Sequence, residues 1–177
     1  MGPGQIRAYS QEDFAACCEL YTLNEPGRFP PGWLPNFEET LRKGSALFLI
    51  AEKDGKVRGC GGIRIEATTA GCVAWLSFGL IHPEFQAQGL GTTLLLARLS
   101  LLPRYVAIIG MAPVPASRGF YERFNFRERG RHTWPDGTES SIHLARFSPD
   151  ARSQCERLLA NAGVVLTLGS SEVPIKS

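Results

Sequence analysis

Residues 81–92 read IHPEFQAQGLGT, and this stretch decides the fold. The apolar run before it, Val73 to Ile81, is typical of a strand, and the leucine-rich run after it is typical of a helix. Gly89 and Gly91 therefore lie in a tight turn from a strand into a helix. The first amides of a helix lack partners within it and carry partial positive charge, and glycine lets a bulky anion approach them. The stretch predicts an anion-binding loop, with glycines that only permit the turn as the alternative.

Outward from this turn, the apolar pattern predicts one continuous α/β domain of the order β-α-α-β-β-β-α-β-α-β-β. The expected strands are Ile6–Ala8, Leu47–Ala51, Val57–Glu66, Val73–Ile81, Tyr105–Met111, Phe126–Arg131 and Ser140–Phe147. The expected helices are Phe14–Tyr21, Asn36–Lys43, Gly89–Leu102 and Ala116–Phe124. The dipeptide Asp54-Gly55 predicts a hairpin, so the sheet should be mixed and mostly antiparallel, with helices flanking it.

The chain continues beyond this core. Ser148-Pro149 is a good start for one more helix, and Val164–Leu168 could add a strand before a frayed end. We therefore predict a domain over residues 1–148 and a helical extension over residues 149–177. The extension has an apolar stripe that must pack on the domain or on a partner in a homodimer.

Composition excludes several classes of protein. The 177 residues include 19 Lys and Arg against 17 Asp and Glu, a net charge of +2 that does not indicate nucleic-acid binding. No apolar run is long enough to span a bilayer, so we expect no membrane association. The five cysteines are scattered, without a C-x-x-C pair, which argues against disulfides and a zinc site. A soluble cytoplasmic protein with reduced thiols and no metal is expected.

Two motifs point to a family. Gln86-x-x-Gly89-x-Gly91, preceded by Ile81-His82-Pro83, resembles the acetyl-CoA-binding motif of the GNAT acetyltransferase superfamily. Farther along, residues 120–126, FYERFNF, resemble the second motif of that superfamily. The order of elements matches the family core from residue 6 to residue 147. The resemblance implies a GNAT fold and an enzyme that transfers an acetyl group from acetyl-CoA (coenzyme A) to an amine.

The resemblance also implies the residues that bind acetyl-CoA. The end of the strand before the loop would pair with the pantetheine arm, and the loop amides would bind the diphosphate. The implied positions are Gly79, Leu80, Ile81, Gln86, Ala87, Gln88, Gly89, Leu90, Gly91 and Thr92. Gln86 and Gln88 are neutral where the family often has arginine, so charge for the phosphates must come from the backbone or from arginines elsewhere. The candidates are Arg118, Arg123, Arg127, Arg129 and Arg131, and solvated surface charge is the alternative for most of them.

By the same resemblance Tyr121 is the general acid. A tyrosine phenol keeps its proton at neutral pH and can give it to a departing thiolate. The alternative is that Tyr121 only packs beside Phe120 and Phe124. Glu66, on the polar side of a strand, is a candidate general base that would act through water. The alternative for Glu66 is an ion pair with Arg58 or Arg64, and an amine that arrives neutral needs no base.

Two departures from the family pattern stand out. Asn125 replaces the glycine that usually ends the second motif, and asparagine tolerates the left-handed conformation needed there. Val114 stands where many relatives have asparagine. Because Pro113 and Pro115 flank it, we expect the chain to leave the preceding strand in an irregular conformation.

The acceptor is the least constrained part of the prediction. Trp33 and Trp134 lie in segments that border the acceptor cleft in the family, with the alternative that they only cap the core. Few carboxylates accompany them, which favours a small, partly apolar amine over a polycation. The acceptor could be a small molecule, a lysine or a protein N-terminus. Two alternatives stay open: a noncatalytic acyl-CoA-binding module, and transfer of a longer acyl group or transfer to a hydroxyl.

Overall fold

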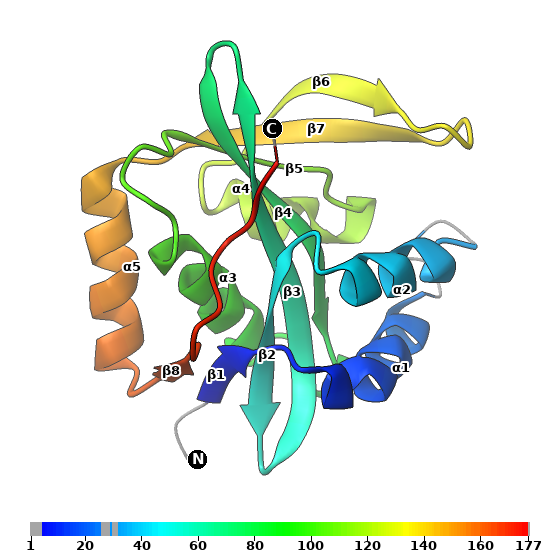
Figure 1. The fold of residues 1–177 in the computed structure, drawn as a ribbon, viewed down its shortest axis with the longest axis vertical. Coiled ribbons are helices and arrows are strands. Elements are labelled where there is room, and N and C mark those ends of the chain that lie inside the picture. The colour runs from blue at the N-terminus through cyan, green and yellow to red at the C-terminus, as the bar shows by residue number, and fades with distance from the viewer. Residues whose placement is uncertain (1–4, 26–28, 30–31, 177) are drawn as a thin grey trace.

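The structure is a computed structural model that describes residues 5–25, 29 and 32–176 (Figure 1). The strands are β1 (Gln5–Ala8), β2 (Leu47–Lys53), β3 (Lys56–Thr68), β4 (Gly71–Ile81), β5 (Ile108–Met111), β6 (Arg127–Thr133), β7 (Glu139–Arg146), β8 (Val165–Thr167) and β9 (Ile175–Lys176). The α-helices are α1 (Phe14–Asn24), α2 (Leu34–Lys43), α3 (Leu90–Ser100), α4 (Arg118–Glu122) and α5 (Pro149–Asn161), with short 3-10 helices η1 (Gln11–Asp13), η2 (Pro83–Phe85) and η3 (Pro115–Ser117).

The strands form one mixed, mostly antiparallel sheet, as the sequence predicts. Its order is β6-β7-β5-β4-β3-β2-β1-β8, and β9 pairs with β3 beside this path. The parallel pairs are β4 with β5, β1 with β8 and β3 with β9. The predicted hairpin turn at Asp54-Gly55 is present, with positive φ at both residues. The predicted order of elements is therefore confirmed.

Helices cover both faces of the sheet. Because successive side chains of a strand point to opposite faces, the strands contribute to two apolar cores. Helices α3 and α5 lie on one face and α1 and α2 on the other (Figure 1). The first core includes Ile63, Leu95 and Leu159, and the second includes Tyr21, Phe37 and Leu80. None of the helices in the described part of the chain is both long and apolar enough to cross a membrane.

Several elements differ from the predicted bounds by a few residues, and two of these differences have clear local reasons. Helix α2 begins two residues earlier than expected, at Leu34, because Pro35 is compatible with a first helical turn. Strand β5 is shorter than the apolar run that predicted it. The run predicts a strand from Tyr105, and its near-continuous apolar character predicts cover on both faces, but Tyr105 is 55% exposed and Ile108 is 39% exposed, so both predictions are wrong at its start.

The C-terminal extension packs against the domain through α3. Cys155 and Leu159 of α5 are buried in the core with α3, and the Arg152 side chain donates to the Ser100 carbonyl at 3.2 Å. Strand β8 then pairs with β1 at the edge of the sheet. The expectation of a frayed end is wrong for Ile175 and Lys176, because β3 extends past β2 and offers them a free edge.

An ion pair ties β1 to the start of α1. The Arg7 guanidinium donates to both carboxylate oxygens of Asp13 at 2.7 Å and to Glu52 at 2.9 Å. The Asp13 side chain is only 7% exposed and also accepts from the Ser10 amide at 2.8 Å. Burial alone would raise the pKa of Asp13, but the hydrogen bonds from Arg7 and Ser10 outweigh it, so this pKa lies below its usual value.

We expect Asp13→Asn to lower the free energy of unfolding by about 1–3 kcal/mol at pH 7, because a charged hydrogen-bond partner is lost. A carboxylate with a depressed pKa stabilises the fold above its unfolded pKa of about 4, and this stabilisation is lost as the pH falls toward the folded value. The difference between the two proteins, measured by urea unfolding, should therefore shrink toward pH 3. The control is Glu39→Gln, which removes an exposed pair with Lys43 and should have no measurable effect. An equal effect of the two variants would contradict this account.

Candidate functional site

The site begins at an irregularity in β4. The register between β3 and β4 shifts between Cys60 and Gly62, and opposite this shift Phe78 has a positive φ of 45°. Such a bulge bends and twists a strand. On its other side β4 pairs with β5 only over Val73–Trp75, so residues 76–81 of β4 have no ladder partner in β5. The two parallel strands diverge, and one edge of β4 is free there.

The loop after β4 has the conformation of an open turn. Ala87 and Gly89 have positive φ values of 57° and 87°. A Cβ on Gly89 would meet no atom within 4 Å, so the loop is not filled by side chains at that point. Gly89 is the N-cap of α3, whose first amides therefore face a space that an anion could enter.

A cavity of about 560 Å³, which we call the loop cavity, lies between this loop, α3 and α4. Arg123 of the segment after α4 borders it and lies against the Phe120 ring, with its guanidinium carbon 5.4 Å from the ring centre. The loop cavity combines backbone amides with a cation, which is an arrangement suited to phosphate groups.

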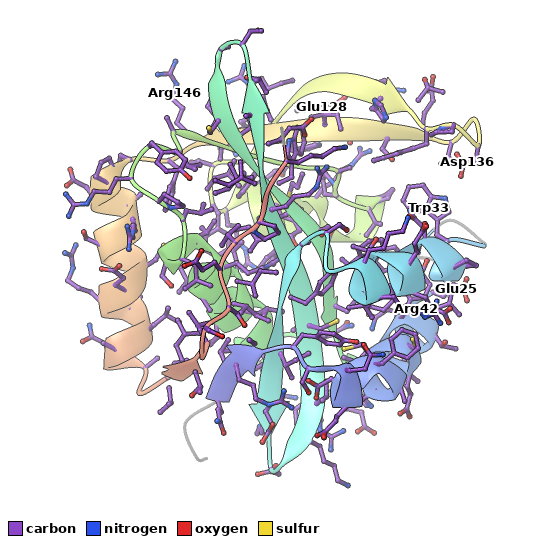
Figure 2. The ribbon with its side chains drawn as sticks, viewed as in Figure 1. Glu25, Trp33, Arg42, Glu128, Asp136 and Arg146 are labelled. Carbon is purple, nitrogen blue, oxygen red and sulfur yellow. The ribbon has the colours of Figure 1, made fainter. Side chains whose placement is uncertain are left out.

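A second cavity of about 550 Å³, the hairpin cavity, lies between β4, α2 and the β6–β7 hairpin. Trp33 and Trp134 both border it, and their rings pack edge to face with 5.3 Å between the ring centroids. Figure 2 shows Trp33, just before α2, lying toward Asp136 in the hairpin turn, and the Trp33 indole donates to this carboxylate at 2.8 Å. This volume suits a small ligand or the end of a chain.

The two cavities share five bordering residues, which we call the junction: Asn24, Gly79, Arg98, Ser117 and Tyr121. The junction has room for the Tyr121 hydroxyl because Gly79 has no side chain. A Cβ there would lie 2.9 Å from the Tyr121 hydroxyl and 3.4 Å from Nη2 of Arg98. The Tyr121 hydroxyl thus lies over Gly79, in the part of β4 that does not pair with β5 and where the two cavities meet.

A hydrogen-bonded group fixes the end of β4. The Asn24 amide donates to the Ile81 carbonyl at 3.2 Å, and the Gln86 amide donates to the same carbonyl at 3.0 Å and to Asn24 at 3.1 Å. Gln86 borders the loop cavity, but these contacts make it a residue that positions the strand end against α1.

Most of the other predicted binding residues gather around the loop cavity. Gly79, Ile81, Ala87, Gly89, Gly91 and Thr92 border it. Leu80, Gln88 and Leu90 are not among its bordering residues. Leu80 points into the core beneath α1 and α2, and the Gln88 side chain turns back to the Glu84 carbonyl at 2.6 Å.

The general base that the sequence suggested is not at the site. Glu66 borders neither cavity, and its carboxylate lies 3.7 Å from the Arg64 guanidinium, which was the alternative for this residue. Its strand position lies beyond the paired part of β2, where β9 joins β3. In the second motif, Asn125 adopts the expected left-handed conformation at φ 63°, in the turn between the end of α4 and β6.

Sequence reasoning missed Asn24 and Arg98, which belong to the junction, and Glu139, which borders the hairpin cavity. Arg98 lies four residues after Leu94 on the buried side of a helix that is otherwise apolar there. A charged residue in an apolar stripe is the signal that could have identified it. The positions of Asn24 and Glu139 follow from tertiary packing and carried no such signal. No group of three or more metal-ligating side chains occurs in the part of the chain that the structure describes.

Comparisons with known proteins agree with this geometry. A sequence profile described as Acetyltransferase (GNAT) family matches residues 14–126. No curated protein sequence matches the chain. Among solved structures, a GCN5-related N-acetyltransferase from Rhodopseudomonas palustris is similar with a TM-score of 0.65 and 16% identity, over 83% of this chain and 98% of its own.

Several of the similar structures contain a ligand, including the following two. The PaiA N-acetyltransferase from Thermoplasma acidophilum, solved with coenzyme A, has a TM-score of 0.63 and 18% identity, over 83% of this chain and 100% of its own. A GNAT family acetyltransferase from Brucella melitensis, solved with acetyl-CoA, has a TM-score of 0.61 and 22% identity, over 82% of this chain and 89% of its own. At these identities the likeness concerns the fold.

Proposed function

Because the chain belongs to the GNAT acetyltransferase family, we propose that it transfers an acetyl group from acetyl-CoA to a primary amine. The observation that carries this proposal is the junction, where the Tyr121 hydroxyl lies over Gly79 of β4 between two cavities. One cavity suits a phosphate-bearing molecule, and the other suits a small acceptor. A direct transfer needs two such ligands to meet at one point.

The residues around the loop cavity fit acetyl-CoA. Apart from the Ile81 carbonyl, which accepts from Asn24 and Gln86, the edge of β4 that does not pair with β5 would hydrogen-bond the pantetheine arm as an added strand does. The loop amides and Arg123 would hold the phosphates, supplying the positive charge that Gln86 and Gln88 do not. Bound there, acetyl-CoA would supply an activated acetyl thioester.

The chain's own groups would do the remaining chemistry. Tyr121 would give its phenolic proton to the departing sulfur, and a backbone amide of Leu80 or Ile81 would stabilise negative charge on the acetyl oxygen. Glu139 is the one carboxylate among the described residues that border the hairpin cavity. Its side chain is 61% exposed, so it could accept the proton of the amine through water.

The proposal is tested in two steps. Calorimetric titration should show acetyl-CoA binding at micromolar to sub-millimolar concentrations, and a thiol-release assay with a panel of amines should show turnover. Absence of acetyl-CoA binding would overturn the proposal. Binding without thiol release for any amine would instead favour a noncatalytic acyl-CoA-binding module, the second function that the position of Glu66 leaves open.

We expect Trp134→Ala to raise the KM of the acceptor about 3- to 10-fold, because the variant removes an aromatic wall of the hairpin cavity. The dissociation constant of acetyl-CoA, measured by calorimetry, should not change, since Trp134 does not border the loop cavity. Tyr105→Ala, which removes a ring that is already 55% exposed, is the control and should leave both values unchanged. A weakened affinity for acetyl-CoA would contradict this placement.

A further inference from the structure

The charges around the hairpin cavity are strongly unequal. Three arginines border it, Arg64, Arg98 and Arg118, against one carboxylate, Glu139. Glu139 lies 3.6 Å from Arg131 and Arg64 lies 3.7 Å from Glu66, so Arg98 and Arg118 are the bordering arginines without an ion pair in the described chain. A cavity with this charge balance attracts an anionic ligand and repels a polycation.

Arg98 is the most deeply buried of these cations, with a relative exposure of 2%. None of the ion pairs within 4.0 Å in the described chain includes it. Its Nε and Nη1 donate to the Leu94 and Gly62 carbonyls at 3.4 Å each, which are long contacts for a guanidinium with five N–H donors. A buried cation without a counter-charge is costly unless a ligand provides one.

Three other residues that border the same cavity each have a buried hydrogen-bond donor without a partner in the described chain. Nε of Arg118, Nε1 of Trp75 and Oγ of Ser77 are buried atoms with no hydrogen-bond partner among the described residues. Buried donors are rarely left unpaired in proteins. The residues that border the hairpin cavity therefore have more donors and positive charge than the described protein groups satisfy, and an anionic ligand on Arg98 would reduce this imbalance.

We infer that the acceptor is a small amino acid-like molecule whose carboxylate is bound by Arg98 at the junction, beside the amine that is acetylated. This inference rests on the proposed function. Nη2 of Arg98 and the Tyr121 hydroxyl both lie within 3.5 Å of the Cβ position of Gly79, so an anion on Arg98 lies next to the reacting amine. Carboxylate and amine must then be only a few bonds apart in the acceptor. The walls formed by Trp33, Trp75 and Trp134 favour an apolar side chain.

The test compares leucine, phenylalanine and tryptophan with their carboxamides, in which a neutral amide replaces the carboxylate, at a pH where the α-amines of both are mostly protonated. In the wild-type protein each carboxamide should have a KM about 10- to 100-fold higher than its amino acid, from the loss of a charged hydrogen bond. Arg98→Met should remove this preference by raising the KM of the amino acids alone, and Arg98→Lys should restore part of it. Arg104→Met, a change at an exposed residue outside both cavities, is the control and should keep the full preference.

Calorimetry of the same amino acids with the coenzyme A-bound protein gives a readout without turnover. Binding that is lost in Arg98→Met but kept in Arg104→Met would support the inference. Carboxamides that bind or react as well as the amino acids would overturn it. So would an Arg98→Met variant whose kcat falls equally for every amine, because Arg98 would then act on the reacting atoms. Failure of the proposed function is distinct, since it would appear as absence of acetyl-CoA binding.

Discussion

Tyr121→Phe should lower kcat about 100-fold or more while the dissociation constant of acetyl-CoA stays unchanged. The variant removes only the hydroxyl that lies over Gly79 at the junction, and a positioned general acid contributes about 10²- to 10⁴-fold. The ring would remain packed against Phe120 and Phe126, which lie 4.8 and 5.7 Å away between ring centres. Packing, and with it the shape of both cavities, should therefore be preserved.

The measurement is steady-state thiol release together with calorimetry of acetyl-CoA. Tyr105→Phe makes the same chemical change at an exposed tyrosine that borders neither cavity, and it should leave kcat as it is. A Tyr121→Phe enzyme with the kcat of the wild type would show that Tyr121 only packs in the core, and another group would have to protonate the departing sulfur.

Gly89→Val should weaken acetyl-CoA binding at least about 10-fold, because it changes the loop at its open point. The φ of 87° at Gly89 is one that L-residues rarely adopt, and holding valine there costs about 1–3 kcal/mol. The new side chain would also enter the space through which the phosphates approach the amides at the start of α3. Calorimetric titration of acetyl-CoA measures the effect.

Backbone strain alone could lower affinity by destabilising the protein, and Gly55→Val controls for this. Gly55 has a φ of 67° and equally open surroundings, but it lies in the β2–β3 turn and borders neither cavity. We expect both variants to lose a similar free energy of unfolding, and only Gly89→Val to lose affinity for acetyl-CoA. Equal affinities in the two variants would mean that the loop does not bind the phosphates.

Local interactions explain why much of the fold could be predicted. The alternation of apolar residues, the Asp54-Gly55 turn and the proline at the start of α5 act within a few residues, so the sequence carries them directly. The left-handed conformation of Asn125 is also a local property, because asparagine tolerates a positive φ better than most residues other than glycine. Glu66 shows the limit of such reasoning. The alternation of residues places it on the polar side of a strand, but it does not tell whether that position lies near the cavities.

The sequence by itself determined the order of strands and helices and the turn at residues 86–92, because hydrophobic period and turn chemistry are short-range properties. Only the tertiary structure decided that β4 and β5 diverge after Trp75, that the Tyr121 hydroxyl and Arg98 meet over Gly79, and that β9 pairs with β3. These features join residues far apart in the chain. They depend on how whole elements pack on the two faces of the sheet, and no local pattern of residues specifies that packing.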